Sequence, residues 1–226
     1  MTVEIPAHKL VYMPVPKAAC TSVKAALSTI DPARPLTAAQ IAEDEHIVHD
    51  VYQTRRFRPH RWEPFCDGTW WRFAVVRDPL KRVLSVYTDM IMSRNILSHS
   101  PRLRDQSELP IDPDPDFFFQ NLLEYMEHSS IIKHHALSSH LFLGKDPAQF
   151  DRWYRTDELD LLAQDMSDHV RREVKIPRAN SSKGKLDPDE LKLKTHKSLA
   201  GYLEEEYEVL SGYFPNPYKR SLSSLI

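Results

Sequence analysis

Two segments of the chain place cationic and hydroxyl side chains where an apolar run gives way to a helical pattern. The first runs from Lys17 to Ser22 in the order Lys-Ala-Ala-Cys-Thr-Ser. The second has Arg77 directly after an apolar run, and Ser85 eight positions later. A turn that enters a helix directs backbone N–H groups and the positive end of the helix dipole at one point, which favours phosphate or sulfate. Two such turns indicate one ligand with two anionic ends.

Together the segments resemble the two cofactor-binding motifs of the sulfotransferases, which use 3′-phosphoadenosine 5′-phosphosulfate (PAPS). The likeness is strongest to the carbohydrate-modifying branch (sulfotransferase family 2), with its Pro-Lys-x-x-Cys-Thr-Ser and Val-Arg-Asp-Pro-x-x-Arg-x-x-Ser patterns, and a fainter likeness continues to about Tyr213. The resemblance implies a P-loop-like α/β fold. It also implies transfer of a sulfuryl group from PAPS to a hydroxyl acceptor, expected to be a carbohydrate, with 3′-phosphoadenosine 5′-phosphate (PAP) as the product.

The first motif resembles the loop that holds the 5′-phosphosulfate. By resemblance, Lys17 contacts the bridging oxygen or the leaving phosphate, where negative charge grows during a loose transfer. An ordinary helix start with a surface lysine is the structural alternative. The loop is not the Gly-x-x-x-x-Gly-Lys-Ser/Thr of ATP-binding proteins. The residues expected to bind the cofactor here are Pro16, Lys17, Ala18, Ala19, Cys20, Thr21 and Ser22.

The second motif resembles the site for the 3′-phosphate. By resemblance Arg77 and Ser85 hold this phosphate, and Ser85 also restrains Lys17 until the acceptor binds. Arginine suits this role because its guanidinium offers a fork of donors. A capped core helix with an incidental serine is the structural alternative. Lys81 and Arg82 are interpreted as solvating the surface of the helix.

A late polar loop, residues 180–185, is a second anion-binding candidate. In related enzymes a basic loop closes over the nucleotide, and Lys183 is expected to do so here. A solvated linker is the equally weighted alternative.

The base that takes the acceptor proton is expected between the two motifs, where related enzymes supply a histidine or glutamate. We predict His49, with His46, Glu43 and Glu45 behind it, and His60 as a further possibility. A histidine titrates near neutral pH, which suits general-base catalysis. For any single histidine of this segment a surface or structural role is the alternative.

A further histidine group comprises His134, His135 and His140. No spacing of His, Cys and carboxylate residues forms a persuasive metal site, so no metal is predicted. Structural roles come first for these residues, and acceptor binding by His135 comes second.

Length, charge and cysteine count exclude several classes of protein. A chain of 226 residues suits one domain, here residues 1–226, and its net charge of −2 argues against a general nucleic-acid binder. Cys20 and Cys66 are too few for a disulfide framework and are expected to be reduced thiols. Neither a signal peptide nor a membrane-spanning run is visible. The chain is therefore expected to be cytoplasmic, and it looks like a bacterial version of its animal relatives.

Strand and helix patterns alternate along the chain, which predicts a three-layer fold with a central, mainly parallel sheet flanked by helices. Asp78 is expected to cap a helix that begins at Pro79. Residues 55–68 are expected to form a loop, and residues 99–116 a long surface segment without regular structure. Strands are predicted at 9–15, 70–76 and 150–155, and helices at 21–30, 117–127, 158–174 and 191–213.

Two other functions remain open from the sequence. One is a P-loop-like kinase using ATP, which is disfavoured by the missing glycine-rich loop and the lack of a clear Mg²⁺-binding carboxylate after a strand. The other is a nucleotide-binding protein without catalytic activity. The acceptor, its regiochemistry and the oligomeric state are not predicted.

Overall fold

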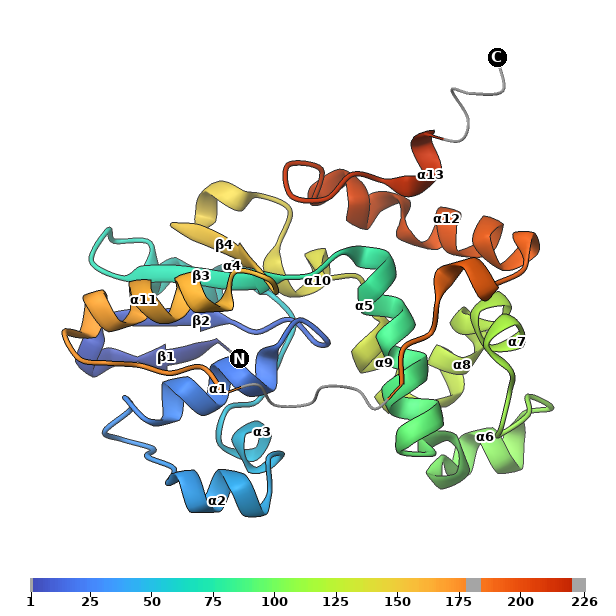
Figure 1. Ribbon diagram of the computed structural model, residues 1–226, viewed down its shortest axis with the longest axis horizontal. Coiled ribbons are helices and arrows are strands. Elements are labelled where there is room, and N and C mark those ends of the chain that lie inside the picture. Colours follow the sequence, from blue (N-terminus) through green and yellow to red (C-terminus); the bar gives the residue numbers. More distant parts are fainter. Residues whose placement is uncertain (1, 178–183, 221–226) are drawn as a thin grey trace. The chain divides into compact units, whose positions relative to one another are not determined.

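The computed structural model describes residues 2–177 and 184–220. Four strands form one sheet in the order β1-β2-β3-β4 (Figure 1). The β2, β3 and β4 strands run parallel, and β1 is antiparallel to β2, so the sheet is mainly parallel as predicted. The β1 strand was not expected, because three residues carry too little alternation to read as a strand. The strands are β1 Val3–Ile5, β2 Leu10–Met13, β3 Trp71–Val76 and β4 Arg152–Arg155.

The chain divides into two compact units, residues 1–77 with 139–181 and residues 78–138 with 182–226. The expectation of one domain for the whole chain stays a prediction. The first unit holds the sheet and the helices α1 Cys20–Ser28, α2 Ala38–Glu43, α3 Ile47–Val51, α4 Pro59–Trp62, α10 His140–Leu143 and α11 Leu159–Val170. The second holds α5 Pro79–Val86, α6 Pro101–Gln106, α7 Pro115–Gln120, α8 Leu122–His128, α9 Ser130–Ala136, α12 Leu193–Val209 and α13 Pro217–Arg220.

One face of the sheet packs against α1 and α11. Tyr12 lies opposite Phe73 in the register of β2 and β3, and their rings stack with centroids 5.1 Å apart. Because strand side chains alternate between faces, these residues share their face with every second neighbour. The apolar stripe of α11, centred on Leu162 and Met166, and that of α1 join the same buried cluster, and Figure 1 shows α11 lying across the strands.

The other face of the sheet carries aromatic side chains. Trp153 of β4 points there, opposite Ala74 of β3. Its ring lies 5.6 Å from Phe150, which in turn lies 4.6 Å from the buried Trp62 of α4. Helical segments therefore cover both faces of the sheet within the first unit, which makes the fold a mixed α/β sheet flanked by helices.

The two segments expected to lack regular structure contain short helices. Residues 55–68 include α4, which begins at Pro59, and residues 99–116 include α6, which begins at Pro101. Leu103 and Leu109 are buried, and the Tyr87 hydroxyl donates to the carbonyl of Pro113 at 2.9 Å. The prolines misled the prediction, because proline at the first position of a helix starts it rather than breaking it.

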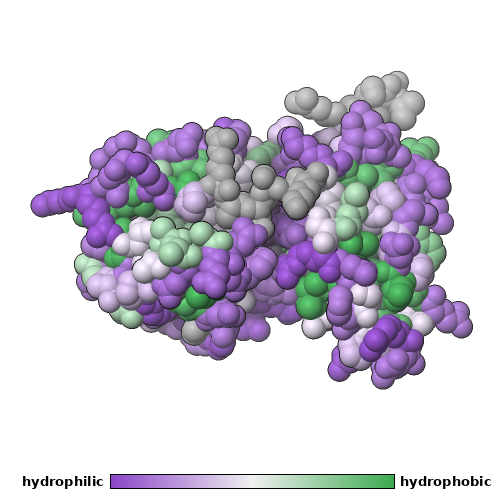
Figure 2. All heavy atoms as spheres, turned by 60° about the horizontal axis from the view of Figure 1, so that its bottom comes forward, coloured by the Kyte–Doolittle hydropathy of each residue, from purple (hydrophilic) through white to green (hydrophobic). Residues whose placement is uncertain are grey.

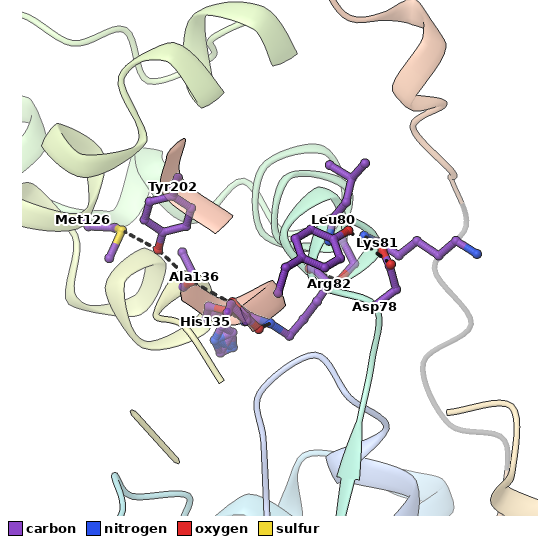
Figure 3. A network of polar contacts seen from close by, with 11 residues as sticks. Asp78, Leu80, Lys81, Arg82, Met126, His135, Ala136 and Tyr202 are labelled. Carbon is purple, nitrogen blue, oxygen red and sulfur yellow. Dashed lines mark hydrogen bonds and ion pairs between the residues drawn. The ribbon is translucent and has the colours of Figure 1, made fainter. Parts of the chain in front are cut away.

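The second unit has a buried ion pair at its centre. The Arg82 guanidinium donates to both carboxylate oxygens of Glu206 at 2.8 Å, and neither side chain is exposed by more than 1%. Arg82 also donates to the carbonyls of His135 and Ala136, and the Tyr202 hydroxyl donates to that of Ala136 (Figure 3). The interpretation of Arg82 as a solvated surface residue was wrong, because periodicity alone did not reveal its distant acidic partner.

Other helix predictions hold with smaller changes. The buried stripe of α5 and the long helix near the C-terminus are confirmed as α5 and α12. The helix predicted over 117–127 is instead two helices, α7 and α8, separated at Asn121.

Hydrophilic side chains dominate the surface drawn in Figure 2, and hydrophobic ones form separate patches. The most exposed large hydrophobic residues are Leu193, Leu123 and Met92, which lie on different segments of the second unit. Within residues 2–177 and 184–220, none of the helices has the length and hydrophobicity needed to cross a membrane.

Candidate functional site

The loop between β2 and α1 has an unusual backbone. Lys17 and Ala19 both adopt left-handed conformations, with φ of 65° and 56°, while Ala18 between them does not. The left-handed region costs a non-glycine residue about 1–2 kcal/mol, and such strain concentrates at ligand sites. Successive backbone N–H groups in a turn of this kind form a concavity that binds anions. Ala19, the N-cap of α1, makes no side-chain capping hydrogen bond.

The end of β3 supports this loop. One guanidinium nitrogen of Arg77 donates to the carbonyl of Lys17 at 3.1 Å, and the N–H of Ala18 donates to the carbonyl of Val15 at 3.3 Å. The parallel register, which pairs Met13 with Ala74, brings both strand ends to the same edge of the sheet. The structure therefore brings together the first motif and Arg77, two predicted parts of the site that are 60 residues apart in the chain.

A polar cluster connects the first turns of α1 to α3. The Thr21 hydroxyl lies 2.9 Å from Nε2 of His49, and Nζ of Lys24 lies 3.0 Å from Nδ1 of the same ring. Lys24 also donates to the hydroxyl of Thr54 at 2.7 Å, and its side chain is fully buried. Burial lowers the pKa of Lys24 to about 8, partly offset by the nearby Cys20. The predicted base is thus in contact with the predicted cofactor loop.

Sequence reasoning missed Lys24. It is three residues beyond Thr21, so the two side chains lie on neighbouring positions of one helix face. A lysine on an otherwise buried helix was the available signal, since lysine is almost never fully buried without a partner. Without the fold, nothing in the sequence showed that this face of the helix is covered by α3.

The turn between β3 and α5 differs from the β2–α1 loop in how its helix end is capped. One carboxylate oxygen of Asp78 accepts from the N–H of Lys81 at 2.9 Å, which confirms Asp78 as the N-cap of α5. The hydroxyl of Tyr207 donates to the other oxygen at 3.2 Å and accepts from the N–H of Leu80. A carboxylate therefore occupies the N-terminus of α5. This agrees with the capping role predicted for Asp78, and binding of an anion by Arg77 and Ser85 beside this turn stays a prediction.

The model of the sulfotransferase family matches residues 2–208, nearly the whole chain. The chain belongs to the sulfotransferase family. No curated protein and no solved structure matches it. Membership of this family makes the protein a transferase and supports sulfuryl transfer to a hydroxyl-bearing acceptor.

The other bases considered for a sulfotransferase lie near His49 or on the surface. The His46 ring is 6.1 Å from the His49 ring between centroids, and its side chain is exposed. Glu43 is exposed, Glu45 is half-buried, and His60 is exposed on α4. None of these positions excludes His49, whose role stays a prediction.

The structure does not test the remaining predicted residues of the sulfotransferase site. Ser85 is buried in the second unit and donates to the carbonyl of Arg82 at 2.6 Å, so its predicted roles toward Lys17 and the 3′-phosphate stay predictions. Lys183 lies outside the described residues. Cys20, which is buried, and Cys66, which is exposed, are free thiols. In the part of the chain that the structure describes, no group of three His, Cys, Asp or Glu residues is arranged to hold a metal ion.

Proposed function

We propose that the protein transfers a sulfuryl group from PAPS to a hydroxyl of a carbohydrate. The observation that supports this most strongly is the β2–α1 loop, where Lys17 and Ala19 are left-handed and the N-cap residue of the helix makes no side-chain cap, a backbone arrangement that suits an anion. Backbone N–H groups, a lysine and hydroxyl side chains are a donor set that fits a phosphosulfate. Arg77, which is bound to the same loop, adds a guanidinium for the second anionic end.

The proposal gives each predicted residue a role toward the cosubstrate. Residues 16–22 hold the 5′-phosphosulfate, Arg77 and Ser85 hold the 3′-phosphate, and Lys183 covers the nucleotide. PAPS supplies the sulfuryl group, whose bond to the bridging oxygen breaks as the acceptor oxygen bonds to sulfur. Lys17 then neutralises the charge that develops on that oxygen, an interaction made chiefly in the transition state.

His49 is proposed as the base. Its ring contacts Thr21 of the loop, which supports a position close to the transferred group. Removing a general base typically lowers turnover by about 10²–10⁴-fold. We expect His49→Ala to lower turnover by this factor, with a much smaller effect on PAP affinity. If the rate is unchanged, the same experiment moves to His46, His60, Glu45 and Glu43.

The finer parts of the proposal rest on the sequence motifs. The Pro-Lys-x-x-Cys-Thr-Ser pattern is that of the carbohydrate-modifying branch, which is why the acceptor class is proposed as a carbohydrate. The strand–loop–helix unit at residues 10–28 supports a P-loop-like fold, although its loop uses left-handed alanine and lysine where ATP-binding loops use glycine.

The test is selective stabilisation by nucleotides. We expect PAP to raise the thermal stability of the full chain, by roughly 2.7 kcal/mol at 100 times its dissociation constant. AMP, which is PAP without the 3′-phosphate, and ADP should stabilise it much less. Equal stabilisation by PAP and ADP would contradict the 3′-phosphate site, and selective stabilisation by ATP with Mg²⁺ would favour the kinase alternative.

A further inference from the structure

In the polar cluster of Thr21, Lys24 and His49, the contacts restrict which ring nitrogen of His49 carries a proton. Both nitrogens of the His49 ring are engaged, Nε2 with the Thr21 hydroxyl at 2.9 Å and Nδ1 with the Lys24 amine at 3.0 Å. Lys24 is completely buried, and its other contact is the Thr54 hydroxyl. Among the described residues, no carboxylate forms an ion pair with Lys24, although burial of a lysine normally requires one.

The chemistry of the two partners restricts the proton positions. An ammonium has three donors and no lone pair, so a charged Lys24 can contact Nδ1 only if Nδ1 accepts. A neutral imidazole has one donor and one acceptor, so the hydrogen must then be on Nε2. Nε2 in turn donates to the Thr21 oxygen, and this directs the hydroxyl hydrogen of Thr21 away from the ring.

We propose that Lys24 is a positioning residue of the site, which keeps the proton of His49 on Nε2 and thereby orients the Thr21 hydroxyl to donate to an anion in the β2–α1 loop. The ligand part of this inference rests on the proposed binding of PAPS by that loop. The buried ammonium replaces the carboxylate or carbonyl that usually orients a functional histidine. It makes the ring a donor toward the loop rather than an acceptor.

The arrangement also defines what a base role of His49 requires. To accept a proton, Nε2 must first release the one it carries to solvent, while Nδ1 takes up a proton from the Lys24 ammonium 3.0 Å away and becomes the donor. Lys24 must therefore give up this proton, and its neutral amine then accepts from Nδ1–H. A lysine whose pKa burial lowers to about 8 can do so close to neutral pH. Lys24 would thus determine when His49 changes from donor to acceptor.

The first experiment is ¹⁵N NMR of the histidine rings in the full chain at pH 7, without ligand. His49→Gln identifies the signals of His49 by their loss. We expect Nδ1 in the range of an unprotonated nitrogen and Nε2 in that of a protonated one. A proton on Nδ1 would overturn the inference, and this result does not depend on whether any variant of Lys24 folds.

The second experiment is a double-mutant cycle read out by PAP affinity. Thr21→Val should weaken PAP binding about tenfold, because it removes a hydrogen bond to a charged group, and Thr21→Ser should retain affinity. Lys24→Met should also weaken binding. In the double variant the loss should not exceed the larger single loss, because both changes act through the same hydroxyl.

A matched control removes a different buried polar group from the same helix. Ser28 is fully buried and donates to the carbonyl of Ala25, three residues earlier in α1. Ser28→Ala should leave PAP affinity unchanged. If the losses from Thr21→Val and Lys24→Met multiply, or if Lys24→Met binds PAP normally, Lys24 is not a positioning residue.

The outcomes also separate this inference from the proposed function. If the unaltered chain does not bind PAP, the proposed function fails, and the role assigned to the Thr21 hydroxyl fails with it. If the unaltered chain binds PAP normally but carries a proton on Nδ1 of His49, this inference alone fails.

Discussion

The two strand–loop–helix segments look alike in sequence but differ in the residue that caps the N-terminus of the helix. At α1 the N-cap is a left-handed alanine, Ala19, which makes no side-chain capping hydrogen bond. At α5 the N-cap is Asp78, whose carboxylate accepts from Lys81 and Tyr207. The N-cap residue of the first helix therefore supplies no anionic group to the helix end, whereas that of the second supplies a carboxylate.

The same contrast extends to the cation that each helix buries. Lys24 of α1 contacts an imidazole and a hydroxyl, neither of which is a carboxylate. Arg82 of α5 has a bidentate carboxylate partner in Glu206. Among the described residues, Lys24 thus has no carboxylate partner, whereas Arg82 is neutralised by one.

The largest expected effect on stability concerns the buried ion pair between Arg82 and Glu206. Glu206→Gln leaves Arg82 buried without its counter-charge, and breaking a buried pair in this way costs about 3–5 kcal/mol. Denaturant unfolding should measure the loss. Glu208→Gln on the same helix is the matched control. Its ion pair with Lys219 is exposed, so it should cost less than about 1 kcal/mol. Similar losses of unfolding free energy in the two variants would show that the buried pair contributes no more to stability than the exposed one.

The next effect concerns the buried cation of the first segment. Burial lowers the pKa of Lys24 from its ordinary 10.5 to about 8, so between these values the unfolded chain binds more protons than the folded protein. Stability from this group must therefore rise with pH over that window, by on the order of 3 kcal/mol. We expect the unfolding free energy of the unaltered chain to rise relative to Lys24→Met from pH 8 to 10.5. Parallel pH curves would show that Lys24 titrates normally.

A third effect compares the lysines of the two turns. Lys17→Ala should reduce turnover by about 100-fold or more, by analogy with loss of a donor to developing negative charge, with a smaller effect on PAP affinity. Lys81, exposed in the first turn of α5, is the matched control, and Lys81→Ala should leave both quantities unchanged. Single-turnover rates and PAP titrations measured together decide this. Equal effects at the two lysines would mean that the turns are equivalent.

Strands β2 and β3 and the helices that follow them could be predicted from local patterns. The strands around Tyr12 and Phe73 and the α1 helix follow from runs of apolar residues, and the Asp78-Pro79 start of α5 follows from capping preferences. These features depend on neighbours in the sequence, which is why periodicity and turn chemistry find them.

What could not be predicted depends on contacts between distant residues. Arg82 and Glu206 are 124 residues apart, and Lys24 and His49 are 25 apart, so no local pattern shows that they pair. The left-handed backbone of Lys17 and Ala19 was also hidden, because the usual signal for that conformation is glycine. The predicted 3′-phosphate role of Ser85 and the role of Lys183 remain predictions.

The smallest expected effects come from substitutions at the two N-caps, which should change the unfolding free energy in opposite directions. Asp78→Ala should lower the unfolding free energy by about 1 kcal/mol, because it removes the cap of α5, while Asp78→Asn should largely retain it. Ala19→Gly should raise stability by about 0.5–1 kcal/mol, since relief of the left-handed strain exceeds the entropy cost of glycine. Ala18→Gly, next to it but not left-handed, should destabilise by a similar amount. If Ala19→Gly is also destabilising, the α1 end is not strained, and the argument that its backbone is held for a ligand loses its energetic basis.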